Sequence, residues 1–98
     1  MNTLKLTARI TELNAQRYTP AGIPAADLLL DHEGESEETG QMRKVTLSVK
    51  AVALGSLAET ICKLPIGSRH LFTGFLAATR NGKGSVFHVQ AFDTQAFE

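Results

Sequence analysis

Two segments of the chain alternate apolar and polar residues with a period of two, and this pattern constrains the fold more than any other feature. Residues 4–11 read LKLTARIT, and residues 43–53 read RKVTLSVKAVA. Successive side chains of a β-strand point to opposite faces of the sheet, so each segment is predicted to be a strand with one buried and one solvated face. A shorter alternation over residues 26–31 predicts a strand between them.

Turn-forming residues separate the predicted strands. The TPAG sequence at 19–22 predicts a turn, because Pro fixes φ and Gly adopts positive φ readily. The Asn-Gly pair at 81–82 lies between two apolar segments and is the strongest short-range signal of a hairpin. It joins two further predicted strands, over residues 69–78 and 85–92. Gly74 within the first of these predicts a bulge or a sharp bend.

One short helix is predicted between the third and fourth strands. Gly55 interrupts the alternation, and the SLAE sequence at 56–59 has the pattern of a capping box, in which the Ser and Glu side chains bond each other's backbone N–H groups. The helix is predicted to run to about residue 64. Three apolar residues are spaced to form one buried stripe along it: Leu57, Ile61 and Leu64.

The order of these elements predicts an all-β fold. Three strands, a helix and two strands in this order are typical of a five-stranded OB-fold barrel with one short helix between strands three and four. An SH3-like barrel lacks a helix at that place, whereas an open α+β sheet fits the order about as well. The length suffices for one modest core, so we expect residues 1–98 to form a single OB-fold domain.

The net charge of zero hides an uneven distribution. Five of the ten acidic residues lie within DHEGESEETG, residues 31–40. The other five face ten Lys and Arg, so the rest of the chain has a charge of 10 − 5 = +5. We interpret the acidic segment as a solvated loop. The alternative is a segment that repels a polyanion or binds a basic partner.

No motif indicates catalysis or metal binding. The three histidines His32, His70 and His88 are isolated in sequence, and Cys62 lies inside the predicted helix, where a core position is the ordinary interpretation. The GxSxG motif and the phosphate-binding loop are both absent from the sequence. We therefore expect a protein that is not an enzyme and that needs no metal and no cofactor.

The sequence also bears on location. No apolar segment approaches 18 residues, the N-terminal residues do not have the pattern of a signal peptide, and the single cysteine excludes an internal disulfide. We expect a cytoplasmic protein without a membrane partner.

Cations lie on the predicted solvated faces of the strands and on the loops beside them. Single-stranded nucleic acid needs such a surface, because its phosphates contribute much of the affinity. Charges that only keep the protein soluble are an equally good explanation of this pattern alone. The residues concerned are Lys5, Arg9, Lys44 and Lys50 on strands, Arg80 and Lys83 at the hairpin, and Arg17 beside Tyr18 in the first loop.

Two longer segments, RYTPAGIPAADLLLDH (17–32) and LAETICKLPIGSRHLFTGFL (57–76), resemble bacterial single-stranded-DNA-binding proteins. The GIP of the first loop, the GS before strand four, the GF that follows and the NG of the last hairpin are more similar to one family of that fold, the primosomal replication protein N (PriB) family. The resemblance covers nearly the whole chain.

The resemblance implies an OB-fold homodimer that acts in the restart of stalled replication forks. Such proteins bind single-stranded DNA, contact the PriA helicase and help to assemble other primosome components, with single-stranded-DNA-binding protein as a further partner. Pairing is expected through the first strand, because an edge strand with regular alternation is a template for its own copy. The implied dimer interface is Leu4, Lys5, Leu6, Thr7 and Arg9.

The resemblance also implies a DNA-binding surface. It comprises the outer face of the third strand, with Arg43, Lys44, Thr46 and Lys50, and the hairpin cations Arg80 and Lys83. The residues themselves add Arg17 and Tyr18 in the first loop and Phe75 on the outward face of the fourth strand. We expect the cations to form one continuous track.

One departure from the family pattern matters for affinity. The family's best-known pattern has a tryptophan at the position of Thr46, and this chain has no tryptophan. Stacking of one base on an aromatic side chain is worth about 1–3 kcal/mol. Tyr18 and Phe75 could replace part of it, whereas Phe72 and Phe87 are expected to fill the core. We therefore expect weak, mostly electrostatic DNA binding.

The alternative function is a protein-interaction module that keeps the barrel but binds little nucleic acid. It would use the acidic segment and outward apolar residues such as Leu71 and Phe75. An RNA-binding OB-fold is disfavoured, because nothing in the sequence indicates recognition of a 2′-hydroxyl group.

Overall fold

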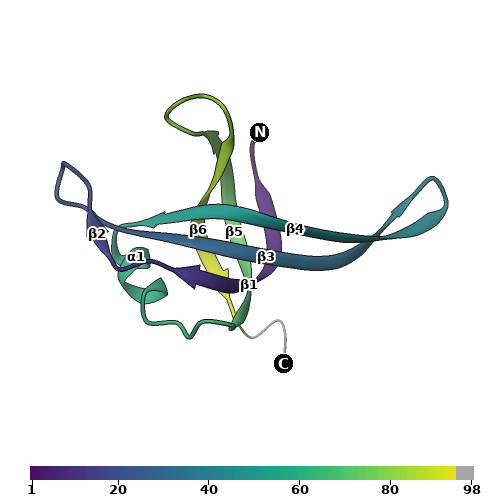
Figure 1. Ribbon diagram of the computed structural model, residues 1–98, viewed down its shortest axis with the longest axis horizontal. Coiled ribbons are helices and arrows are strands. Elements are labelled where there is room, and N and C mark those ends of the chain that lie inside the picture. Colours follow the sequence, from purple (N-terminus) through teal and green to yellow (C-terminus); the bar gives the residue numbers. More distant parts are fainter. Residues whose placement is uncertain (95–98) are drawn as a thin grey trace.

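The computed structural model describes residues 1–94, in which six strands and one helix follow one another along the chain (Figure 1). Strands exceed the predicted lengths at several ends, whereas the helix is shorter than predicted. The elements are β1 (Leu4–Leu13), β2 (Arg17–Tyr18), β3 (Pro24–Glu38), β4 (Gln41–Leu54), α1 (Ser56–Ile61), β5 (Arg69–Ala78) and β6 (Ser85–Asp93).

Five of the strands close into a barrel. The sheet has the order β1-β5-β6-β4-β3-β2, and an additional pairing of β1 with β3 closes it. The β4–β6 pairing is parallel and the others are antiparallel. The short α1 lies between β4 and β5 in the chain, so the predicted OB-fold is confirmed. The two-residue β2, which was not predicted, only extends the sheet beside β3.

The core of the barrel contains the residues that the alternation placed inside. Phe72 of β5 and Phe87 of β6 are fully buried, as predicted, together with Ile10 of β1 and Leu30 of β3. Ile61 of α1 is also fully buried. Truncation of a buried Phe to Ala costs about 3–5 kcal/mol, so these side chains account for a large share of the stability.

The predicted capping box is wrong, although the predicted apolar stripe is correct. Gly55, with φ of 76°, is the N-cap, and no side chain bonds the backbone there. Its carbonyl accepts the N–H of Ala58 at 3.0 Å, so the backbone itself makes the first turn. The helix ends at Ile61 rather than near Leu64, while Leu57 and Leu64 pack against the core.

The acidic segment is not a loop, contrary to prediction. Its residues up to Glu38 belong to β3 and pair with β4 without a break from Ala25↔Leu54 to Glu38↔Gln41. Thr39 and Gly40, both at positive φ, make the turn. The outer part of this hairpin, residues 33–46, extends away from the barrel, and we call it the arm (Figure 1). By the alternation of residues 43–53, Leu47 lies on the same side of β4 as the core residues Ala51 and Ala53. It is nevertheless 44% exposed, because the barrel ends before this residue.

Gly74 forms the predicted bulge. The β5–β6 register shifts between Thr73 and Gly74. A Cβ atom at Gly74 would overlap the carbonyl oxygen of His88, so the two strands approach each other too closely for any other residue.

Candidate nucleic-acid interface

A groove of about 400 Å³ lies on the outside of the barrel, at the base of the β5–β6 hairpin. Lys50 of β4 is the cation that lines it, and Glu12 and Asp27 are the acids. Apolar side chains of β3, β4 and β6 complete the surface. The lining residues are Glu12, Asn14, Asp27, Leu28, Leu29, Lys50, Ala51, Thr79 and Val86.

Arg17, predicted to contact DNA, is paired with an acidic side chain that the sequence did not single out. Its Nε donates to Oδ2 of Asp27 at 2.5 Å and its Nη2 donates to Oδ1 at 2.9 Å. The hydrogen bonds from Arg17 lower the pKa of Asp27, and those to Asp27 raise the pKa of Arg17. The two side chains are 50% and 37% exposed, so this rim of the groove is electrically neutral but accessible.

The cations of β4 are not all on one face. Lys44, Thr46 and Lys50 alternate with inward residues and share the outer face, as predicted. Arg43 lies on the opposite face, opposite Ser36, and its Nη1 donates to Oε1 of Glu38 at 2.5 Å. The prediction that Arg43 belongs to the outer face is therefore wrong.

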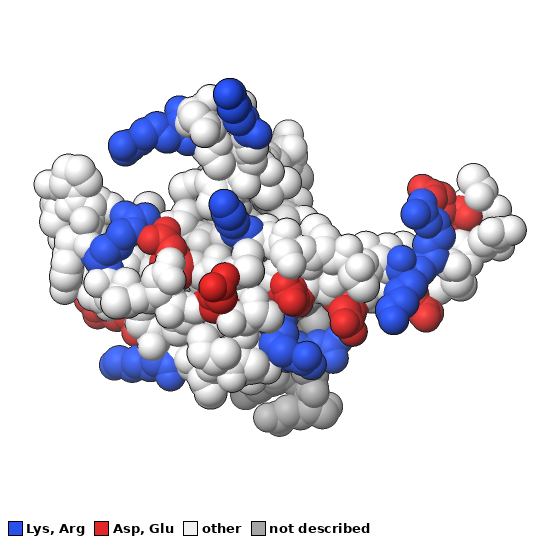
Figure 2. Space-filling model, in the orientation of Figure 1, with Lys and Arg blue, Asp and Glu red and all other residues white. Residues whose placement is uncertain are grey.

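Acidic residues lie directly beside the outer-face residues of β4. Glu35 is opposite Lys44, Glu33 is opposite Thr46 and Asp31 is opposite Ser48, and opposite residues of a strand pair share a face. Figure 2 shows a row of acidic side chains along β3, while cations lie on both hairpins and at several places on the barrel. The expected continuous cationic track is thus interrupted by carboxylates along the arm.

The β5–β6 hairpin presents two exposed cations. Arg80 and Lys83 are exposed, and neither has an ion-pair partner among residues 1–94. The Oδ1 of Asn81 accepts the backbone N–H of Lys83 at 2.9 Å and the hydroxyl of Thr79 at 2.8 Å, and Gly82 has φ of 72°. The predicted Asn-Gly hairpin is confirmed, and its turn holds both cations beside the groove.

The two predicted aromatic contacts differ in their availability. Tyr18 is 64% exposed, and its hydroxyl accepts the Nε2 amide of Gln16 at 3.2 Å. Phe75 is half-buried, and its ring stacks on that of His88 with centroids 4.9 Å apart and planes 5° apart. Sequence reasoning missed His88 because its partner lies on a neighbouring strand and neither residue forms a motif.

The predicted dimer residues lie on β1, at the point where this strand has a free edge. Residues 4–8 pair with β5 on one side, and pairing with β3 on the other side begins only at Arg9. The carbonyl of Thr7 contacts Nδ1 of His32 at 2.6 Å. Leu4 and Leu6 line a pocket of about 380 Å³ together with exposed or half-buried apolar residues of β4 and β5, namely Leu47, Val49 and Leu76.

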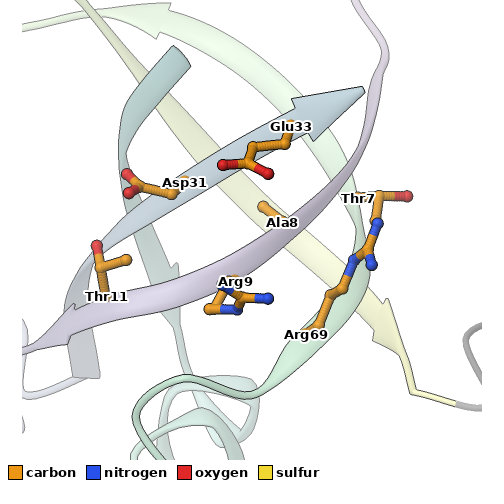
Figure 3. A pocket seen from close by; sticks show the side chains of 7 residues that line it. All are labelled: Thr7, Ala8, Arg9, Thr11, Asp31, Glu33 and Arg69. Atoms are coloured by element: carbon orange, nitrogen blue, oxygen red, sulfur yellow. The ribbon is translucent and has the colours of Figure 1, made fainter. Parts of the chain in front are cut away.

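A second pocket, of about 180 Å³, lies beside this free edge and has charges of both signs (Figure 3). Asp31 and Glu33 of β3 lie across β1 from Arg9 and Arg69. Two acids and two cations give no net attraction for a polyanion. The charges of this pocket therefore do not favour the binding of DNA there.

The buried histidine has a structural role. His70 contacts the hydroxyls of Thr94 and Ser68 with its two ring nitrogens, both at 2.8 Å, and burial lowers its pKa. Among residues 1–94, no group of three His, Cys, Asp or Glu side chains is placed to hold a metal ion. No helix in this part of the chain has the length and apolar character needed to span a membrane.

The chain is similar, in sequence and in structure, to proteins of one family. Residues 2–91 match the family described as another single-strand binding protein family. Replication restart protein PriB of Bordetella pertussis is 48% identical over 91 residues, which cover 92% of this chain and 85% of that protein. The structure of PriB from Ralstonia solanacearum, 34% identical, superposes with a TM-score of 0.88 over 96% of this chain and 97% of the other.

Proposed function

The chain belongs to the single-strand binding protein family, among the PriB replication restart proteins, and on this premise we propose that it is a replication restart accessory protein that binds single-stranded DNA. The observation that supports DNA binding best is the pair of unpartnered cations, Arg80 and Lys83, beside a groove that contains Lys50. The phosphates of a flexible strand would bind to these cations. Binding of phosphates does not depend on the base sequence.

Binding is weak and mostly electrostatic in this proposal. Arg17 already has Asp27 as a partner and Arg43 has Glu38, so neither offers a free charge to a phosphate. Lys44 and Thr46 lie opposite carboxylates of β3. Of the aromatic side chains predicted to contact a base, Tyr18 is exposed and Phe75 is half-buried, and the chain has no tryptophan.

We further propose that the protein is a cytoplasmic homodimer that docks onto the PriA helicase during primosome assembly. Support for the dimer comes from the free β1 edge and from the apolar pocket beside it. A second copy pairing along Leu4, Lys5, Leu6 and Thr7 would cover both, with Arg9 at the end of the free edge, where the pairing with β3 begins.

Substitution of the hairpin cations tests the DNA-binding proposal. Lys83→Ala should weaken binding of oligothymidylate and of mixed sequences alike, and should reduce the slope of log K against log salt by about 1. Lys63→Ala, which removes an exposed cation just after α1, is the matched control and should change neither quantity. Equal effects of the two substitutions would mean that Lys83 is an ordinary solvated charge. The double variant Arg80→Ala/Lys83→Ala should show the larger loss.

The alternative is a protein-interaction module with little nucleic-acid binding, and the arm favours it. The outer face of the arm has a row of carboxylates, which repel DNA but would attract a basic protein surface. Affinities for PriA without DNA and for an oligonucleotide without PriA, measured side by side, separate the two functions. Tight helicase binding with no measurable oligonucleotide binding would favour the alternative.

A further inference from the structure

We propose that a second groove, between α1 and β6, receives one unstacked base of the bound strand, and that the imidazole ring of His88 is the surface on which the base stacks. This proposal rests on the proposed DNA binding, but it names a site and a residue of its own. The groove measures about 320 Å³. Its lining residues are Val52, Leu54, Ser56, Leu57, Phe75, His88, Val89 and Gln90.

The walls of this groove suit a flat, largely apolar group. Val52 and Leu54 of β4 and Leu57 of α1 provide aliphatic surface opposite the aromatic ring of His88. Among residues 1–94, no carboxylate lines the groove, in contrast to the larger groove with Glu12 and Asp27. A nucleobase is planar, and every base can stack on an aromatic face, so the site would accept any sequence.

The His88 ring is held in place before any ligand arrives. Phe75 stacks on it with centroids 4.9 Å apart and an angle of 5° between the planes. The backbone of His88 is also fixed, because the bulge brings Gly74 against its carbonyl oxygen. A side chain that is already ordered loses little conformational entropy when a base stacks on it, and this favours binding.

The groove adjoins the cations proposed to bind phosphate. His88 is the neighbour of Val52 on β4, and Val52 follows Lys50 by two residues on the same face. Two residues of a strand span about 7 Å. A phosphate at Lys50 would therefore bring the next base to the groove. Among residues 1–94, His88 is the only titratable residue that lines it, so no negative charge from this part of the chain opposes the strand there.

A tryptophan at the site provides a direct probe, because the chain has none of its own. In His88→Trp, titration with oligothymidylate should quench the tryptophan fluorescence as a thymine stacks on the indole. In the control Ile66→Trp, the tryptophan would lie at an exposed position (59% for Ile66) in the connection between α1 and β5, and its fluorescence should not change. Equal responses of the two variants would overturn the proposal.

Affinity measurements with labelled oligothymidylate give a second test that does not depend on tryptophan. His88→Ala should weaken binding about 5- to 150-fold, the range expected for one lost stacking partner of about 1–3 kcal/mol. His88→Phe keeps the flat ring and should restore most of the affinity, which a purely structural role of the imidazole nitrogens would not allow. Circular dichroism melting curves show whether each variant is folded.

The remaining outcomes separate this proposal from the proposed function. If the unmodified protein binds oligothymidylate and His88→Ala binds it equally well, the stacking site is wrong while DNA binding stands. If His88→Ala loses affinity for PriA alone, the groove receives an apolar peptide side chain and the proposal is overturned. If the unmodified protein binds no oligonucleotide at low salt, both proposals fall.

Discussion

Among the glycines of residues 1–94, Gly74 has the least room for an added side chain. The closest atom to an added methyl group is the backbone carbonyl oxygen of His88, which cannot rotate away as a side chain could. Gly74→Ala should therefore destabilise the protein by about 3 kcal/mol or more, at the upper end of the cost of overpacking. Gly84→Ala is the control, because its added methyl group would meet only the Thr79 side chain at 3.8 Å. Urea unfolding of both variants measures the difference, and similar midpoints would contradict the close approach.

His70 makes the stability depend on pH. Its pKa is lowered by burial, so below the unfolded-state value of about 6.5 the unfolded chain binds a proton that the folded chain does not. The free energy of unfolding should be constant above that pH and should decrease as the pH falls toward the folded-state pKa. His70→Gln keeps hydrogen-bonding groups for Ser68 and Thr94 and should flatten this decrease. The free energy of unfolding is measured with urea for both proteins between pH 7 and 5. An equal decrease in the two would show that His70 is not the source of the pH dependence.

The lowered pKa of Asp27 affects the stability in a lower pH range than the pKa of His70 does. Its bonds with Arg17 stabilise the fold fully above the unfolded-state value of about 3.9, and this stabilisation is lost at lower pH. Because both side chains are partly exposed, the effect is small.

At the scale of elements, the arm is the part that sequence reasoning described least well. Acidic residues have low strand propensity, so the run from Asp31 to Glu38 indicated a loop. Pairing with β4 overrides this tendency, because each carboxylate faces water while the backbone completes the ladder. Arg43 was misplaced for another reason, because it was assigned to the outer face from the family resemblance, whereas the alternation of β4 puts it on the opposite face. The barrel strands, whose alternation reflects a buried face, were predicted well.

The arm should be dispensable for folding. Its residues beyond Gly34 and before Val45 are exposed, and in the described sheet they pair with one another. A variant in which residues 36–43 are replaced by Asn-Gly should keep the thermal unfolding midpoint within a few degrees, because no core residue is removed. Loss of folding, measured by circular dichroism, would mean that the arm supports the barrel. The same variant removes Glu37 and Glu38 together with Arg43, so its DNA affinity should change little.

At the scale of the whole molecule, the proposed homodimer would pair through the free edge of β1. Leu47 is exposed in the single chain and lines the pocket formed with Leu4 and Leu6. Leu47→Lys should leave the barrel folded but weaken dimerisation roughly 30-fold, if each copy loses about 1 kcal/mol of apolar burial. Met42→Lys, at an exposed position outside that pocket, is the control. Sedimentation velocity over a range of concentrations distinguishes them, and a monomer in the unmodified protein would contradict the β1 interface.

The sequence predicted the barrel and the hairpin cations, but it could not predict which charges are already neutralised. Arg17 and Asp27 are ten residues apart and meet only because β2 pairs with β3. The stacking of Phe75 on His88 likewise requires the register of β5 and β6. Contacts between strands that are distant in the sequence therefore decide how much of a predicted surface remains available for a ligand.

The salt dependence of oligothymidylate binding tests the central claim, that accessible cations around one groove bind the phosphates of a flexible strand. A dimer that neutralises about four to six phosphates should give a slope of log K against log salt of roughly −3 to −4. Fluorescence anisotropy of a labelled oligonucleotide at several salt concentrations provides this slope. A slope near zero, or no binding at the lowest salt concentration, would contradict the account.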